Sequence, residues 1–115
     1  MSDQTITIFH NPRCSKSRQT LELLQSRGLE PRVVEYLQTP PTAAELRAIL
    51  AKLGKRPAEL LREREAAEAG VSRDLPDDAL IEAMVKAPAL IERPIVVRGD
   101  RARLGRPPES VLELL

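Results

Sequence analysis

The 115-residue chain has few of the residue types that most readily reveal a protein's function. One cysteine and one histidine supply neither an intramolecular disulfide nor the four ligands of a usual structural zinc site, so we expect no metal. With Phe9 and Tyr36 as the only aromatic residues, the chain lacks a stacking platform for single-stranded nucleic acid. Lys and Arg total 18 against 17 Asp and Glu, without the basic excess of nucleic-acid binders. These absences argue against disulfide scaffolds, zinc fingers and nucleic-acid binding.

Long apolar segments are missing as well. No run approaches the roughly 20 residues of a membrane span, and residues 1–10 lack a basic region followed by an apolar signal segment. We therefore expect a cytoplasmic protein with no membrane partner, in a compartment that keeps a lone thiol reduced. The length is typical of one domain with one hydrophobic core.

The first third of the chain has the pattern of a strand, a helix and a second strand. The predicted elements span residues 5–9, 15–27 and 32–36, with Gly28 placed to end the helix. Strand–helix–strand crossovers are parallel and right-handed almost without exception. The loop over residues 10–14 is therefore expected at the carboxyl end of the first strand, where open α/β sheets bind ligands.

The middle of the chain is predicted to be helical. The expected helices span residues 42–54, 57–61 and 77–87. Thr42 and Glu45 form a capping box at the start of the first of them, and Gly54 ends it. Residues 63–70 are highly charged and fit either a continued helix or a mobile connection, and the pattern does not decide between the two.

Strand periodicity returns near the end of the chain. Residues 95–97 and 101–104 predict a hairpin across a two-residue Gly-Asp turn. A last helix is expected from Pro107, with Val111, Leu112 and Leu115 on its buried side.

This element order predicts an α/β, thioredoxin-like fold, in which helices flank a mixed four-stranded sheet. We expect one domain over residues 1–115. A helical insertion at about residues 41–92 separates its βαβ and ββα halves.

Cys14 is the first candidate for chemistry because it stands where the strand-to-helix loop meets the first helix. Unpaired N–H groups of the first helical turn and the helix dipole favour a thiolate there. Arg13, Lys16 and Arg18 add positive charge nearby, and the Ser17 hydroxyl is three residues away. The alternative is that Cys14 is a small buried hydrophobic residue, as lone cysteines most often are.

The other candidates each have a structural alternative. His10 is placed to orient or deprotonate the thiol, or else to cap the loop. Asn11 shapes the loop through turn geometry and is also a candidate donor to a bound anion. Arg93 and Arg106 precede prolines at loop–strand junctions, where side chains can converge on the Cys14 loop. Arg62, by contrast, fits a solvated charged face.

Four segments together resemble the glutaredoxin-coupled arsenate reductase family, also called ArsC-like, of the thioredoxin-like superfamily. They are His10–Arg18 (the family's HNPxCxxSR), Leu60–Arg62 (LLR), Arg93–Val97 (RPIVV) and Leu104–Pro107 (LxRP). Ser-Lys after the cysteine replaces the Gly-Thr of the arsenate-resistance members, and the chain is shorter than they are. It therefore resembles a short, housekeeping-like branch of this family.

The resemblance implies a site and a reaction. Cys14 is the implied nucleophile, Arg62, Arg93 and Arg106 the oxyanion ligands, and His10 and Ser17 the residues that hold the thiolate. Pro94 is implied to be cis, and no cofactor is expected to bind tightly. The implied reaction reduces arsenate to arsenite through a cysteine–arsenic intermediate, with glutathione as co-substrate and a glutaredoxin as partner.

Two other functions share this architecture. Spx-like regulators bind RNA polymerase and usually carry CxxC, whereas Cys14–Ser17 reads CxxS. A glutathione-dependent thiol reductase would need Cys14 but would tolerate loss of Arg93 and Arg106. The complete arginine set favours the arsenate-reducing enzyme.

Overall fold

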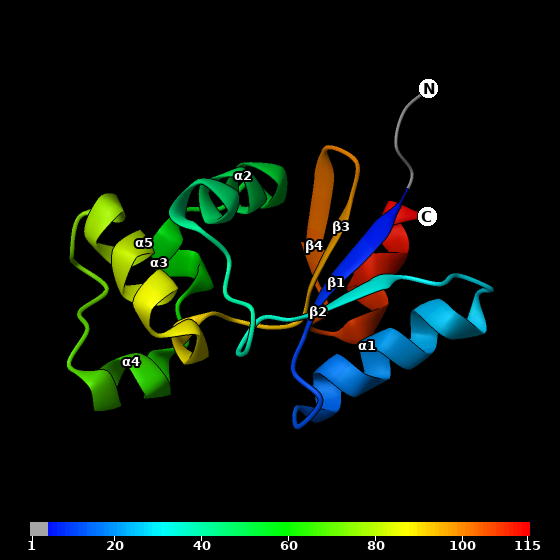
Figure 1. Cartoon of the computed structure of the whole chain (residues 1–115), viewed down its shortest axis with the longest axis horizontal. Coiled ribbons are helices and arrows are strands. Elements are labelled where there is room, and N and C mark those ends of the chain that lie inside the picture. Colours follow the sequence, from blue (N-terminus) through cyan, green and yellow to red (C-terminus); the bar gives the residue numbers. More distant parts are fainter. Residues whose placement is uncertain (1–4) are drawn as a thin grey trace. The chain divides into compact units, whose positions relative to one another are not determined.

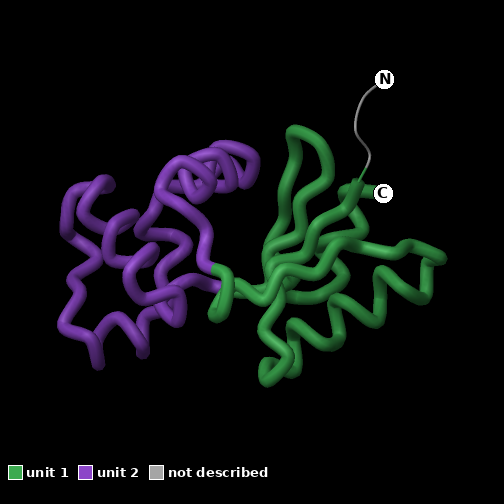
Figure 2. Tube along the Cα trace, viewed as in Figure 1, with its two compact units in different colours: residues 1–39, 93–115 green, residues 40–92 purple. Residues whose placement is uncertain are grey.

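A computed structural model describes residues 5–115, and its elements run through the chain as shown in Figure 1. The chain forms two compact units, coloured separately in Figure 2. The first, here called the sheet unit, contains the chain up to Thr39 together with residues 93–115. The second, the helical unit, contains residues 40–92, the segment expected as an insertion. Within residues 5–115, every helix is too short or too polar to cross a lipid bilayer.

The sheet unit is built on four strands in the order β2-β1-β3-β4. They are β1 (Ile6–His10), β2 (Arg32–Glu35), β3 (Ile95–Arg98) and β4 (Arg101–Leu104). β2 runs parallel to β1, whereas β3 runs antiparallel to both β1 and β4. The strands β3 and β4 enclose the predicted two-residue turn. The sheet confirms the predicted mixed α/β arrangement.

One face of this sheet packs against α1 (Ser15–Ser26) and η2, a 3₁₀ helix over Pro108–Leu114. Alternate β1 side chains are buried, namely Ile6, Ile8 and His10, so these three share the face that α1 covers. The apolar core on this face contains Ile6, Ile8, Leu24, Val96, Val111 and Leu114. His10 therefore continues a row of core residues to the carboxyl end of β1, next to the start of α1.

The prediction for the buried side of the last helix was right for Val111, which is fully buried, and wrong for Leu115. Leu115 is 46% exposed, and Leu114 is buried instead. The reason is that η2 is a 3₁₀ helix with three residues per turn, so positions three apart face the same way. Pro108, Val111 and Leu114 accordingly face the core.

The helical unit consists of four α-helices and a short 3₁₀ helix. They are α2 (Ala43–Leu53), α3 (Pro57–Leu60), α4 (Glu63–Ala69), α5 (Asp77–Lys86) and η1 (Pro88–Leu90). α5 packs against α2, α3 and η1 and buries Leu80, Ile81 and Met84. The sequence left open whether residues 63–70 continue a helix or form a mobile connection. Most of this segment is helical, as the separate helix α4.

The capping box of α2 is present as predicted. The Glu45 backbone N–H donates to the Thr42 hydroxyl (3.1 Å), and the Thr42 N–H donates to the Glu45 carboxylate (3.0 Å). Gly54 ends the helix in the left-handed conformation, with φ of 68°. These local contacts set both ends of α2.

Candidate active site

Cys14 is the N-cap residue of α1, in extended conformation at the end of the loop that follows β1. Its backbone N–H donates to the Asn11 carbonyl (3.0 Å), and its carbonyl accepts from the Arg18 N–H (3.0 Å). These bonds hold a half-buried thiol at the positive end of a 12-residue helix. The structure thus places Cys14 where the sequence predicted it.

The pKa of the Cys14 thiol lies below its ordinary value. Burial raises this pKa, but four other influences outweigh it. The backbone N–H groups of Ser17 and Lys16 stabilise the thiolate, although neither forms a capping hydrogen bond of standard geometry with the sulfur. The charges of Arg93 and Arg106 lower the pKa further. A helix terminus and two residues distant in sequence therefore act on the same sulfur.

His10 and Ser17 form a buried hydrogen-bonded pair beside Cys14 in the chain. The Ser17 Oγ lies 2.7 Å from His10 Nδ1 and accepts the Asn11 backbone N–H at 3.0 Å. Burial lowers the pKa of His10, and Arg18 lowers it too, while Glu35 acts in the opposite direction. The net shift is downward, so the neutral imidazole is favoured.

Asn11 shapes the loop through both its backbone and its side chain. Its Oδ1 accepts the Arg13 backbone N–H at 3.0 Å, and its own N–H donates to Ser17. Arg18 secures the same loop from α1, because its guanidinium donates to the Pro12 carbonyl at 2.9 Å. The loop that carries Cys14 is therefore fixed by contacts with the first turn of α1.

Arg93 and Arg106 lie together in the sheet unit. The Arg106 guanidinium donates to the Arg93 carbonyl at 3.2 Å, and the Gly105 N–H donates to the Pro94 carbonyl at 2.9 Å. The Arg93–Pro94 peptide is cis, as the family resemblance implies, and the Arg106–Pro107 peptide is cis as well. The two arginines that precede these prolines are the ones that act on Cys14.

Gly105 makes this approach possible. A Cβ atom at this position would overlap Thr20 Oγ1 of α1 and would lie 2.7 Å from Pro94 Cγ. Only glycine lets the Arg106 segment pass so close to both. Gly105 was not predicted from the sequence, where its signal is its place between the last strand and Arg106.

Arg62 belongs to the helical unit, and its role as an oxyanion ligand stays a prediction. Its guanidinium forms an ion pair with Glu65 at 2.6 Å and donates to the Ala89 carbonyl at 3.5 Å. Its backbone N–H donates to the Leu90 carbonyl at 2.8 Å, beside a β-bridge that joins the flanking segments. Arg62 is thus held in a fixed position within its own unit.

Glu35, which was not among the predicted site residues, raises the pKa of His10 against the lowering by burial. In the parallel pairing of β1 and β2, His10 and Glu35 are register partners. No local sequence pattern indicates this pairing, because the two residues lie 25 positions apart. The βαβ unit could be predicted from the sequence, but the register of its two strands, which pairs His10 with Glu35, could not.

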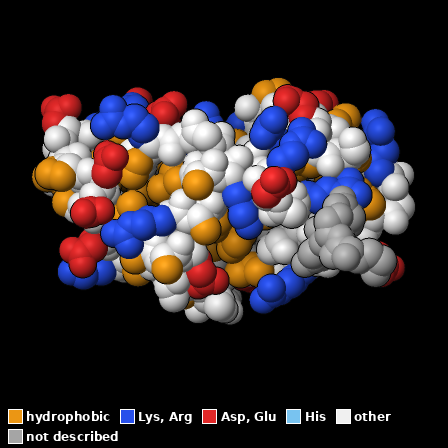
Figure 3. Space-filling model, turned by 90° about the horizontal axis from the view of Figure 1, so that it is seen from above, with side chains coloured by type: hydrophobic (Ala, Val, Ile, Leu, Met, Phe, Trp, Pro, Cys, Tyr) orange, Lys and Arg blue, Asp and Glu red, His pale blue; other side chains and the backbone are white. Residues whose placement is uncertain are grey.

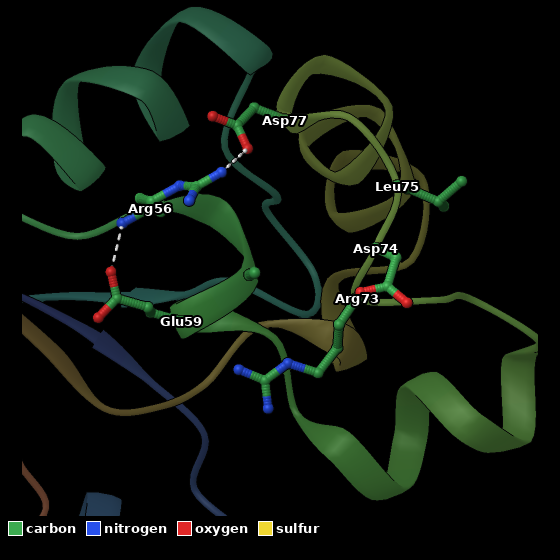
Figure 4. Close-up of a pocket in the computed structure, with 7 residues that line it drawn as sticks. Arg56, Glu59, Arg73, Asp74, Leu75 and Asp77 are labelled. Carbon is green, nitrogen blue, oxygen red and sulfur yellow. Dashed lines mark hydrogen bonds and ion pairs between the residues drawn. The ribbon is translucent and has the colours of Figure 1, made fainter.

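The helical unit also has a pocket of ≈ 440 Å³, shown in Figure 4. Arg56 lies there between Glu59, which accepts its backbone N–H at 2.9 Å, and Asp77, which pairs with its guanidinium at 3.5 Å. Arg73, another lining residue, pairs with Glu63. On the face in Figure 3, Lys and Arg side chains are interspersed with Asp and Glu. Among residues 5–115, no group of three or more His, Cys, Asp and Glu could hold a metal ion.

Comparison with known proteins adds independent evidence. The profile of the ArsC family matches residues 9–114. The chain is 53% identical to the uncharacterized protein YfgD of Escherichia coli strain K12 over 96% of each chain. It is 47% identical to an arsenate reductase of the same strain, over 96% of this chain and 80% of that protein. The solved arsenate reductase from Vibrio cholerae matches with a TM-score of 0.88 and 46% identity, over 98% of this chain and 99% of that one. These likenesses confirm the thioredoxin-like fold and the predicted family, and the chain belongs to the ArsC family.

Proposed function

We propose that this protein reduces arsenate to arsenite with thiols as the electron source. The observation that carries the proposal is the position of Cys14 at the N-terminus of α1, where Arg93 and Arg106, joined to each other by a 3.2 Å hydrogen bond, lower the pKa of the thiol. The guanidinium groups that favour the thiolate also suit a tetrahedral oxyanion, since they pair with its oxygens in a fork geometry. The names of the E. coli and V. cholerae relatives, both arsenate reductases, support the same substrate.

In the proposed reaction the Cys14 thiolate attacks arsenic(V), and an oxygen of arsenate leaves as water. The thiolate of glutathione then adds to arsenic in the same way, with loss of a second water. A glutaredoxin thiolate attacks the glutathione sulfur, so that one disulfide forms and the electron pair of the broken sulfur–arsenic bond stays on arsenic. Hydrolysis of the remaining cysteine–arsenic(III) bond releases arsenite and restores Cys14.

The outside thiols are part of the proposal because Cys14 is the single cysteine of the chain. A protein with a resolving cysteine can expel its own product as an internal disulfide, which is impossible here. Glutathione and a glutaredoxin supply the missing thiols in the cytoplasm. Arg62 completes the proposed set of oxyanion ligands, His10 and Ser17 hold the thiolate, and Asn11 shapes the loop and donates to the anion.

The test is arsenate-dependent oxidation of NADPH in the presence of glutathione, a glutaredoxin and glutathione reductase. We expect Cys14→Ser to abolish turnover and Arg93→Ala to reduce it by about two orders of magnitude or more. Arg64→Ala is the matched control, since Arg64 is exposed and pairs with Glu68 at 3.4 Å. It should keep wild-type turnover.

Four outcomes would contradict the proposal. The first is no arsenate-dependent turnover in the wild type. The second is turnover that survives Cys14→Ser. The third is activity on a glutathione mixed disulfide that is unchanged by Arg93→Ala, which would identify a thiol reductase instead. Capture of RNA polymerase without any turnover would likewise replace the enzyme by a regulator.

A further inference from the structure

Thr20 is a polar residue of α1 that is fully buried in the sheet unit. It lies on the side of the helix that also buries Ser17 and Leu24. Its Oγ1 donates a hydrogen bond to the Lys16 carbonyl at 2.8 Å. A threonine hydroxyl has one hydrogen, and this bond uses it. The Thr20 hydroxyl is therefore directed at a single carbonyl in the first turn of α1.

That carbonyl belongs to the peptide group whose N–H is the backbone N–H of Ser17. Cys14 is the N-cap of α1, so the N–H groups of Lys16 and Ser17, at the second and third helical positions, point toward its side chain. Although burial raises the pKa of Cys14, the Ser17 N–H is the first of the groups that lower it. A hydrogen bond accepted by a peptide carbonyl polarises the peptide and strengthens the bond that its N–H donates. Thr20 thus acts on one end of a peptide group whose other end faces the Cys14 sulfur.

The Thr20 side chain also lies directly against the segment that carries Arg106. A Cβ atom at Gly105 would overlap Thr20 Oγ1 and would lie 3.0 Å from Thr20 Cγ2, so both branches of the side chain border Gly105. The Gly105 N–H donates to the Pro94 carbonyl at 2.9 Å, and the Arg106 guanidinium donates to the Arg93 carbonyl at 3.2 Å. Thr20 is therefore the residue at which the first turn of α1 meets the segments of both arginines.

We propose that Thr20 is a positioning residue of the Cys14 site. Its hydroxyl polarises the Lys16–Ser17 peptide and holds the N–H of that peptide toward the thiolate, while its side chain keeps this first turn against the Gly105 segment. The role rests on the proposed function of Cys14 as a nucleophile. Thr20 acts through the peptide group and not on the substrate, and no covalent bond changes.

A second hydroxyl of α1 provides a matched control. Ser26 Oγ donates to the Leu23 carbonyl at 2.7 Å, so it forms the same kind of bond from a side chain to a carbonyl of the preceding turn. Such bonds are common in helices. Ser26 is exposed and ends α1, at the opposite end of the helix from Cys14. Loss of this hydroxyl removes a bond of the same type without touching the peptide group that faces the thiolate.

The first measurement is the rate of alkylation of the single cysteine as a function of pH, whose midpoint reports the pKa of Cys14. Thr20→Val keeps the shape of the side chain without the hydroxyl and should raise the midpoint by roughly 0.3 pH unit. Thr20→Ala also lacks the hydroxyl but adds no methyl group, and it should shift the midpoint in the same direction. Thr20→Ser keeps the hydroxyl and should restore the wild-type midpoint, and Ser26→Ala should leave it unchanged. An unchanged midpoint without the hydroxyl, or an equal shift in Thr20→Ser or Ser26→Ala, would overturn the proposal.

The second measurement is the NMR chemical shift of two backbone amides, recorded with Cys14 ionised. The Ser17 amide proton should move upfield in Thr20→Val and return in Thr20→Ser, because its peptide group loses and regains the bond to the hydroxyl. The Lys16 amide belongs to the preceding peptide group, which Thr20 does not bind, and it should change little. An equal movement of both amides would show a general distortion of the helix and would contradict the proposal. Neither measurement uses arsenate, so a failure of the proposed reaction and a failure of this role are separate results.

Discussion

The two units use arginine in different ways. In the helical unit, five arginines pair with carboxylates of the same unit, namely Arg47, Arg56, Arg62, Arg64 and Arg73. In the sheet unit, Arg103 likewise pairs with Glu113, but Arg93 and Arg106 lower the pKa of a thiol. The number of arginines in a unit therefore does not show where a functional site lies. The site is recognised by a reactive group, here the Cys14 sulfur, on which the arginines act.

The largest expected effects come from the two cores. Leu24 of α1 and Leu80 of α5 are both fully buried. Replacement of either by alanine should lower the free energy of unfolding by about 2–5 kcal/mol, measured by urea denaturation. Only Leu24→Ala is expected to change the pKa of Cys14, because Leu24 holds the helix that caps the thiol. A similar change of the Cys14 pKa in Leu80→Ala would contradict the expectation that only the core of the sheet unit supports the thiol.

A smaller effect is expected from glycines with different functions. Gly105→Ala adds a methyl group against Thr20 and Pro94 and should lower the free energy of unfolding by about 1–3 kcal/mol. It should also reduce turnover, since it displaces the segment that carries Arg106. Gly54→Ala, at the left-handed end of α2, has open space around its Cβ and should lower only stability, by about 1 kcal/mol. Full turnover in Gly105→Ala would contradict this account.

The sequence predicted what depends on neighbours in the chain. Thr42 and Glu45 are three residues apart and define a cap through bonds that any helix start can form. The position of Cys14 before α1 followed in the same way from a strand pattern and a helix pattern on either side. Such contacts leave a signal within a short window of sequence.

Contacts between distant residues left no such signal. Glu35 reaches His10 only through strand register, and Arg106 reaches Arg93 only because Gly105 passes Thr20 and Pro94 closely. The 3₁₀ form of η2 was also missed, because leucine spacing near the end of a chain fits both helix types. The residues of the site could be predicted in part, but not the partners that tune them.

The lowered thiol pKa in the sheet unit makes stability depend on pH. A thiol with a lower pKa in the folded than in the unfolded state contributes stability that is fully present above the unfolded pKa, ordinarily near 8.5, and is lost as pH falls through the folded pKa. The difference in unfolding free energy between wild type and Cys14→Ser should therefore increase with pH and level off above about 8.5. Urea denaturation across this range measures it. A difference independent of pH would show that the thiol is not activated.

The smallest expected effect separates two neighbouring arginines of the helical unit. The Arg64 side chain is 87% exposed, so its i,i+4 pair with Glu68 is screened by water, and Arg64→Ala should change the unfolding free energy by no more than about 0.5 kcal/mol. Arg62 is only 19% exposed, and Arg62→Ala would leave the half-buried Glu65 carboxylate without this partner. Urea denaturation should therefore show the larger loss for Arg62→Ala. Both are Arg–Glu pairs of neighbouring residues, and they differ mainly in burial. An equal loss of unfolding free energy would mean that burial does not strengthen the Arg62 pair. The short Arg62–Glu65 contact would then be an ordinary surface pair rather than the support of a fixed guanidinium.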